Sequence, residues 1–161
     1  MKNSLNIIFS LIVIAMISSC KKDYTYNVND VNVTKPGNGK SNVKTTTEFI
    51  SIAYSDLFST TIPNDSLLNI SQAYQSFGDR KLIEDRIIRH LLNRTDVQIP
   101  TNQQMRSDVP AFVNQAFQKL FNRTPDAFEN YFVTNIIQLD ATISPVVVYY
   151  ALMTSNEYRY Y

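Results

Sequence analysis

Apolar residues recur at helical spacing through most of the chain after residue 48. The first run follows Thr45, whose hydroxyl can cap a helix while Glu48, three residues later, reaches back to it. Its apolar positions are Phe49, Ile50, Ile52, Ala53, Tyr54, Leu57 and Phe58. They predict one amphipathic helix, which should end at Ile62-Pro63 because a residue before proline disfavours the helical conformation.

Two further amphipathic runs follow the first. Asn64-Asp65-Ser66 offers a cap for a second helix, Gly78 breaks that helix, and Asp79 caps a third. The apolar positions are Leu67, Leu68, Ile70, Ala73, Tyr74 and Phe77 in the second run and Leu82, Ile83, Ile87, Ile88, Leu91 and Leu92 in the third. Residues 95–108 are polar and predict a connection, with at most one short turn at 101–104.

The second half of the chain repeats the pattern of the first. The residues Phe49, Ala53, Tyr54, Leu57 and Phe58 recur 63 residues later as Phe112, Ala116, Phe117, Leu120 and Phe121. Neither half has a second apolar layer of its own, so the two should pack on each other. We therefore predict an all-α domain over 48–161, with six helices in two tandem three-helix repeats, about 48–94 and 109–158.

The last apolar run is ambiguous by itself. Residues 146–153 are rich in Val and Tyr, which gives them the β-propensity of a buried strand. Ser144-Pro145 is a typical helix start, and the repeat also requires a helix at this point. We predict a helix over 146–153, with a strand as the alternative.

The first twenty residues differ from the rest. Lys2 is followed by Ile7–Ile17, an apolar stretch of 11 residues, too short to cross a bilayer core of about 30 Å but typical of a signal peptide. Ile17-Ser18-Ser19-Cys20 comes next and resembles the lipobox of bacterial lipoproteins, whose cysteine receives acyl chains such as palmitate and becomes the new N-terminus. We expect a signal peptide over 1–19 and lipid attachment at Cys20. An ordinary secreted protein is the alternative.

Residues 20–47 are polar and predict a flexible, lipidated tether. The alternation at 24–33 also fits a strand that joins another chain. Residues 21–44 carry five lysines against two aspartates, whereas 48–161 carry nine basic and twelve acidic residues. Without Lys2 the formal charge of the chain is zero, which argues against a nucleic-acid binder, since that function needs a basic face.

The second half carries the pattern F/Y-x-x-L-x-x-R-x-P-x-x-x-E in Phe117, Leu120, Arg123, Pro125 and Glu129. Residues 155–158 then supply an S-x-E-Y ending. This arrangement resembles the DUF4214 domain and the related helical module of phycobilisome linker polypeptides. The resemblance covers about 110–158 and implies an all-helical module used in extracellular or scaffold settings. The resemblance implies no catalytic activity. Asn122 departs from the family pattern, which has a glycine at this position.

The segment around Arg123 also has a physical reading of its own. Thr124 is expected to cap a helix, with Pro125 at its first position and Asp126 in its first turn. Glu129 then lies across the turn from Arg123. We predict a structural ion pair between Arg123 and Glu129 that fixes the angle between two helices. The alternative is an anion site that uses Arg123.

Candidate catalytic residues are few. One cysteine and one histidine exclude a four-ligand zinc site and a disulfide framework, and three glycines leave no phosphate-binding loop. A Ser/His/Asp triad would have to use His90, which is expected near a helix end. Asp65-Ser66-Leu67 resembles the short O-glycosylation acceptor of Bacteroidetes, which makes Ser66 a candidate glycosylation site; a helix cap is the alternative.

The sequence therefore predicts a non-enzymatic, lipid-anchored module of the cell envelope that engages another envelope protein, without a metal or cofactor. A carbohydrate or cell-wall binding module is the alternative, and a small enzyme is third. An exposed apolar face would favour a protein partner, and a tyrosine platform flanked by Asn and Asp would favour a glycan. Lys21 lacks the acidic character of inner-membrane retention signals, which favours the outer membrane, and Lys22-Asp23 matches surface-export signals only in part, which favours the periplasmic face.

Overall fold

The structure is a computed structural model that describes residues 42–160. The predictions for the signal peptide, Cys20 and most of the tether lie outside these residues. The described part is all-α, as the sequence predicts, and contains seven α-helices and no strand. The elements are α2 (Thr46–Phe58), α3 (Asn64–Gln75), α4 (Arg80–Leu92), α5 (Asn102–Ser107), α6 (Val109–Phe121), α7 (Ala127–Leu139), α8 (Pro145–Met153) and the short 3-10 helix η1 (Glu157–Arg159).

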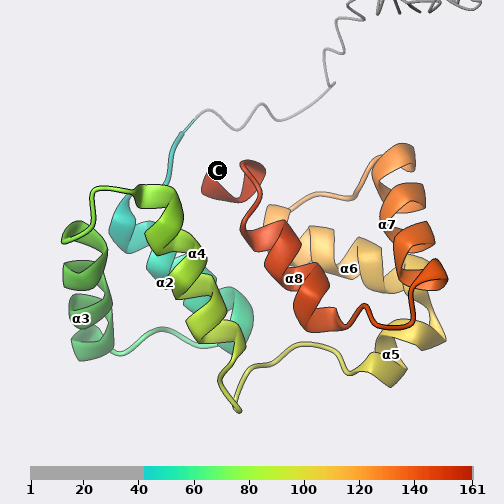
Figure 1. Cartoon of the computed structure of the whole chain (residues 1–161), viewed down its shortest axis with the longest axis horizontal. Helices are drawn as coiled ribbons and strands as arrows, with labels where there is room; N and C mark the ends of the chain where they lie inside the picture. Colours follow the sequence, from blue (N-terminus) through green and yellow to red (C-terminus); the bar gives the residue numbers. More distant parts are fainter. Residues whose placement is uncertain (1–41, 161) are drawn as a thin grey trace, which may run out of the picture. The chain divides into compact units, whose positions relative to one another are not determined.

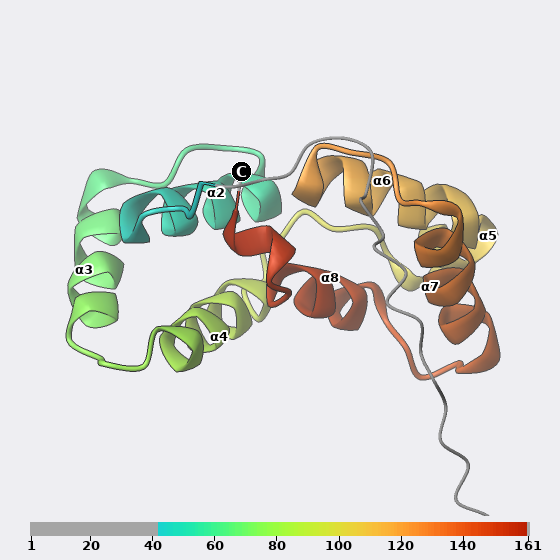
Figure 2. The same ribbon diagram turned by 90° about the horizontal axis from the view of Figure 1, so that it is seen from above.

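The helices form two groups that share one core. Helices α2–α4 make up the first group and α5–α8 the second, with η1 between them (Figure 1). Helices α4 and α8 lie side by side where the groups meet (Figure 2). The buried apolar residues of both groups belong to a single cluster. Burial of apolar surface, which contributes roughly 25 cal/mol per Å², therefore holds the two groups together as one domain.

Helices α2 and α6 are built alike. Each has 13 residues, and both their starts and their ends are 63 residues apart. Thr45 and Asp108 cap them, each through a side-chain oxygen that accepts a backbone N–H. Ser59 and Asn122 terminate them in the left-handed conformation, both with φ of 54°. Asparagine adopts this conformation more readily than most residues, so Asn122 is well suited to end α6. Duplication of an ancestral half stays a prediction.

Helix α8 forms in spite of its β-branched residues. Pro145 stands at its start, where a missing N–H costs nothing. Val148, Tyr149 and Met153 are buried against the core. Tertiary packing therefore decides the conformation of this segment, and the helix prediction for 146–153 is confirmed.

Two helix starts differ from the prediction. Helix α7 is capped by Asp126 rather than Thr124: the Asp126 carboxylate accepts the N–H of Glu129 at 2.7 Å, and the Glu129 carboxylate accepts the N–H of Asp126 at 2.9 Å. A carboxylate cap with glutamate three residues later satisfies two N–H groups at once, so it wins over the threonine. Helix α3 begins directly after Pro63 without a side-chain cap, so residues 64–66 lie inside the helix.

The connection at 95–108 contains more structure than the sequence predicts. Thr101 and Gln104 form a reciprocal capping box, which starts the six-residue helix α5. Because α5 precedes α6 as an additional helix, the described domain has seven helices rather than six. Phe77 is also placed differently: α3 ends at Gln75, and the Phe77 side chain is exposed.

The C-terminal turn η1 links the two groups. Tyr158 is fully buried, with its ring edge-on to Phe49 of α2 at 5.9 Å and to Phe121 of α6 at 6.5 Å between centroids. Its hydroxyl donates to Asp56 at 2.7 Å, and burial together with the charge of Asp56 raises the pKa of Tyr158. The Lys44 ammonium lies 4.0 Å from the centre of the same ring. The packed domain therefore begins before the predicted boundary at residue 48.

Candidate functional site

Helix α7 leaves most of its large apolar side chains in solvent. Ile137 is its one buried residue. The exposed fractions are 71% for Phe128, 68% for Tyr131, 52% for Phe132, 39% for Ile136 and 78% for Leu139. We call these five residues the α7 face.

The α7 face is an apolar stripe that one polar residue, the half-buried Asn135, interrupts. Its members are spaced three, one, four and three residues apart, which places them along one side of a helix, with Ile137 on the opposite side. The rings of Phe128 and Phe132 stack at 5.8 Å between centroids. Taking about 200 Å² for a whole aromatic side chain, the face exposes roughly 600 Å², at the upper end of the patches found on monomers. Patches of this size usually mark a binding surface.

Helix α3 provides an internal comparison for the α7 face. The two helices start 63 residues apart, and the same offset places buried Tyr74 opposite buried Ile137. The α3 positions that correspond to the α7 face are Asp65, Leu68, Asn69, Ala73 and Ser76. One large apolar residue therefore stands where α7 has five. The architecture does not require an apolar outer surface at this position.

A charged cluster lies at the N-terminal end of α7. The Nε and Nη2 atoms of Arg123 donate to the two carboxylate oxygens of Glu157, at 2.6 and 2.7 Å. Its Nη1 and Nη2 atoms donate to those of Glu129, at 2.7 and 2.8 Å. The remaining N–H of Nη1 donates to the Thr124 carbonyl at 3.1 Å. Glu157 first and Glu129 second raise the pKa of Arg123, which stays charged. All five donors of the guanidinium are used, so none remains for a ligand anion.

The structure thus brings Arg123 and Glu129 together and adds Glu157 to them. All three side chains are mostly buried, with exposed fractions of 22% to 28%. Sequence reasoning missed the role of Glu157. No local signal marked it, because Glu157 lies 34 residues from Arg123 and the pair depends on where η1 packs.

The C-terminal end of α7 is closed by a different arginine. Arg106 of α5 donates to the carbonyl oxygens of Ile137 at 2.9 Å and of Asp140 and Ile143 at 3.0 Å each. A cation at this position stabilises the negative end of the helix dipole. Hydrogen bonds from Thr142 and the charge of Arg106 hold the pKa of Asp140 below its usual value. Both ends of α7 are therefore fixed by arginines, and the helix itself contains no Lys or Arg.

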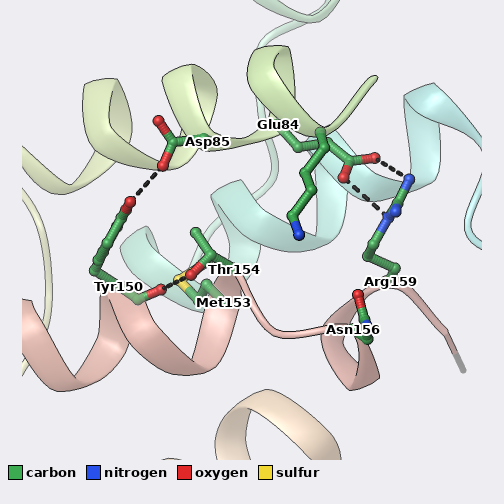
Figure 3. A pocket seen from close by; sticks show the side chains of 8 residues that line it. Glu84, Asp85, Tyr150, Met153, Thr154, Asn156 and Arg159 are labelled. Atoms are coloured by element: carbon green, nitrogen blue, oxygen red, sulfur yellow. Dashed lines mark hydrogen bonds and ion pairs between the residues drawn. The ribbon is translucent and has the colours of Figure 1, made fainter. Parts of the chain in front are cut away.

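A polar pocket of about 310 Å³ lies between α4, α8 and η1 (Figure 3). Arg159 lies 2.9 Å from the Glu84 carboxylate, which also accepts the Tyr74 hydroxyl at 2.7 Å. Burial, reinforced by Glu84, raises the pKa of Tyr74 to about 12. On the other side of the pocket, Asp85 accepts the hydroxyl of Tyr150.

The carboxylates of this pocket are bound by the protein itself. Glu84 and Asp85 are neighbours on α4, but in Figure 3 they turn to different partners. The bond from Tyr150, and a second from Arg89 at 2.9 Å, hold the pKa of Asp85 below its usual value. The lining thus joins α4 to α8 and η1, which makes the pocket a junction of the two groups and a weaker candidate for a ligand site than the α7 face.

No family model, no curated protein and no solved structure matches this chain. The resemblance of residues 110–158 to the DUF4214 and phycobilisome-linker modules therefore stays a prediction.

The remaining candidate residues lie apart from the α7 face. Ser66 is half-buried in the first turn of α3, and its glycosylation stays a prediction. His90 is exposed in the last turn of α4. Within residues 42–160, no group of three or more His, Cys, Asp and Glu side chains is placed to hold a metal ion. None of the described helices is long and apolar enough to cross a membrane.

Proposed function

We propose that this protein is a lipid-anchored scaffold module of the cell envelope, and that it engages another envelope protein through the α7 face. The observation that carries the proposal is the contrast between the two outer helices. Helix α7 exposes five large apolar residues where α3, in the corresponding position, exposes one. Exposed aromatic and aliphatic side chains of this kind are the anchors of protein interfaces.

The chemistry of the α7 face favours a protein over a glycan. A glycan platform would present tyrosine rings flanked by polar side chains that bind hydroxyl groups. The α7 face has one tyrosine, and its other members are two phenylalanines, an isoleucine and a leucine. A protein partner with an apolar surface of similar size would bury all five side chains. A carbohydrate or cell-wall ligand is the second candidate. We propose neither a catalytic activity nor a cofactor, and no interaction with nucleic acid.

Anchoring follows from the lipobox resemblance at Cys20. Acyl chains on this cysteine would hold the protein in a membrane, because each buried methylene contributes about 0.8 kcal/mol. The sequence after Cys20 favours the outer membrane and its periplasmic face. The Cys20→Ala variant should accumulate as a soluble or unprocessed form. Detergent-phase partitioning measures this, and partitioning equal to that of the unaltered protein would contradict a lipid anchor.

The docking function is tested by comparing α7 with α3. The full-length tagged chain is co-expressed with the untagged chain and cross-linked in isolated membranes. It is then purified in detergent, and the proteins attached to it are identified by mass spectrometry. Phe128→Asp/Leu139→Asp should remove the bound partner, whereas Leu68→Asp on α3 should keep it. All three chains should melt within a few degrees of one another, since exposed substitutions usually change stability by about 0.5 kcal/mol or less. A partner retained by the α7 variant would defeat the proposal.

A further inference from the structure

We propose that the protein bound by the α7 face is a second copy of this chain, with the two α7 helices packed antiparallel about a twofold axis. The inference rests on the proposed docking function and specifies its partner. Three features of α7 support it: the area of the face, the distribution of aromatic and aliphatic residues along it, and the charges at its ends.

The area suits a modest but specific dimer. Burying roughly 600 Å² on each copy gives about 1,200 Å² in total, the lower limit for specific protein interfaces. Such an interface is expected to be weak between free molecules. Two copies confined to one membrane by a lipid anchor meet at a raised effective concentration, so a weak contact is sufficient there.

The distribution of side chains favours antiparallel packing. Phe128, Tyr131 and Phe132 occupy the N-terminal part of the face, and Ile136 and Leu139 the C-terminal part. In an antiparallel pair the aromatic part of each copy lies on the aliphatic part of the other. A twofold axis makes both contacts identical, as a closed dimer requires.

The charges select the same direction. Arg123, Asp126, Glu129 and Glu157 give the N-terminal end of α7 a net charge of −2, from one positive and three negative groups. The C-terminal end carries Arg106 beside Asp140 and is neutral. Parallel packing would bring two acidic clusters together. Antiparallel packing separates them by about 20 Å, the length of a 13-residue helix, and opposes the helix dipoles.

Cross-linking in membranes tests the arrangement with the full chain. Cys20 is the one natural cysteine, and its thiol is acylated in the proposed form, so an introduced cysteine is the free thiol. Ala127 and Gln138 are exposed and lie 11 residues, or about three turns, apart on one flank of α7, outside the apolar stripe. Antiparallel packing places Ala127 of each copy next to Gln138 of the other.

Two tagged chains, one with Ala127→Cys and one with Gln138→Cys, are co-expressed and treated with a short bismaleimide in isolated membranes. The expected result is a mixed 127–138 dimer at least fivefold more abundant than either homodimer. Adding Phe128→Asp/Leu139→Asp should abolish it, and Leu68→Asp should not. Absence of the mixed dimer, or equal amounts of all three dimers, would overturn the inference. If the mixed dimer is absent while the α7 substitutions still remove a different bound protein, the docking function stands and the second copy is excluded.

Discussion

The second helices of the two halves, α3 and α7, occupy corresponding positions but differ in the side chains on their outer surfaces. Helices α3 and α7 each follow a helix that ends in a left-handed residue, and they bury Tyr74 and Ile137 at the same register. The outer side of α3 has one large apolar residue, Leu68, whereas that of α7 carries five between Phe128 and Leu139, interrupted by Asn135. The contrast within one chain shows that the fold needs the buried residue of each helix but does not need an apolar outer surface.

A second contrast concerns the arginines that lie over the aromatic pairs of the two halves. Arg94 lies 4.8 Å from the ring centre of Phe58, and Arg123 lies 5.2 Å from that of Phe117. Arg94 pairs with Asp96, and both side chains are well exposed, at 40% and 55%. Arg123 binds two mostly buried carboxylates. The second half is therefore fixed around α7 by a stronger network than any contact of Arg94.

The largest effect is expected where the halves meet. Tyr158→Ala should lower the free energy of unfolding by about 4 kcal/mol, because it removes a fully buried ring that contacts both α2 and α6. Tyr131→Ala on the α7 face is the matched control and should cost about 0.5 kcal/mol or less. Urea unfolding measures both. Similar losses for the two tyrosines would mean that η1 does not join the halves.

The arginines should differ by a smaller amount. Arg123→Ala should cost about 3 kcal/mol, since it removes the cation that Glu129 and Glu157 both bind, and Arg94→Ala should cost much less because its pair is exposed to solvent. The double variant Arg123→Ala/Glu129→Ala should cost less than the sum of its single changes. Thermal unfolding in low and moderate salt compares them. Equal losses of stability at the two arginines, with additive effects at Arg123 and Glu129, would remove the contrast.

The smallest effect concerns the left-handed residues that end α2 and α6. Ser59→Gly should stabilise the domain by about 0.5 kcal/mol, because glycine relieves the strain of positive φ at some entropic cost. Asn122→Gly should change stability by less, since asparagine already tolerates this conformation. A larger gain at Asn122 than at Ser59, measured by thermal unfolding, would contradict this reasoning.

Local signals predicted the fold well. Capping residues such as Thr45 and Asp79 act through neighbours in sequence, so the starts of α2 and α4 can be read from a few residues. At the start of α7, Pro125 favours Thr124 as the predicted cap. The structure has the reciprocal pair of Asp126 and Glu129 in that role. Only a short turn at 101–104 is predicted where α5 forms, since six residues are too few to show periodicity.

The candidate site could be predicted from the sequence to a much smaller extent than the fold. Helix α7 has apolar residues on both of its sides, so periodicity alone does not tell which side meets the core. The partnership of Arg123 with Glu157 spans 34 residues and depends on where η1 packs. Both features are consequences of tertiary packing. The ion pair with Glu129, six residues from Arg123, was within reach of local reasoning.

The most direct test of the central claim is the accessibility of the two outer helices in the membrane. Leu139→Cys on α7 and Leu68→Cys on α3 replace side chains that are 78% and 60% exposed, and each is made in the full-length chain. Maleimide labelling is compared between isolated membranes and dilute protein purified in detergent. We expect equal labelling of both cysteines in the purified protein and strong protection of Leu139→Cys alone in membranes. Equal labelling of the two in membranes would show that nothing covers the α7 face.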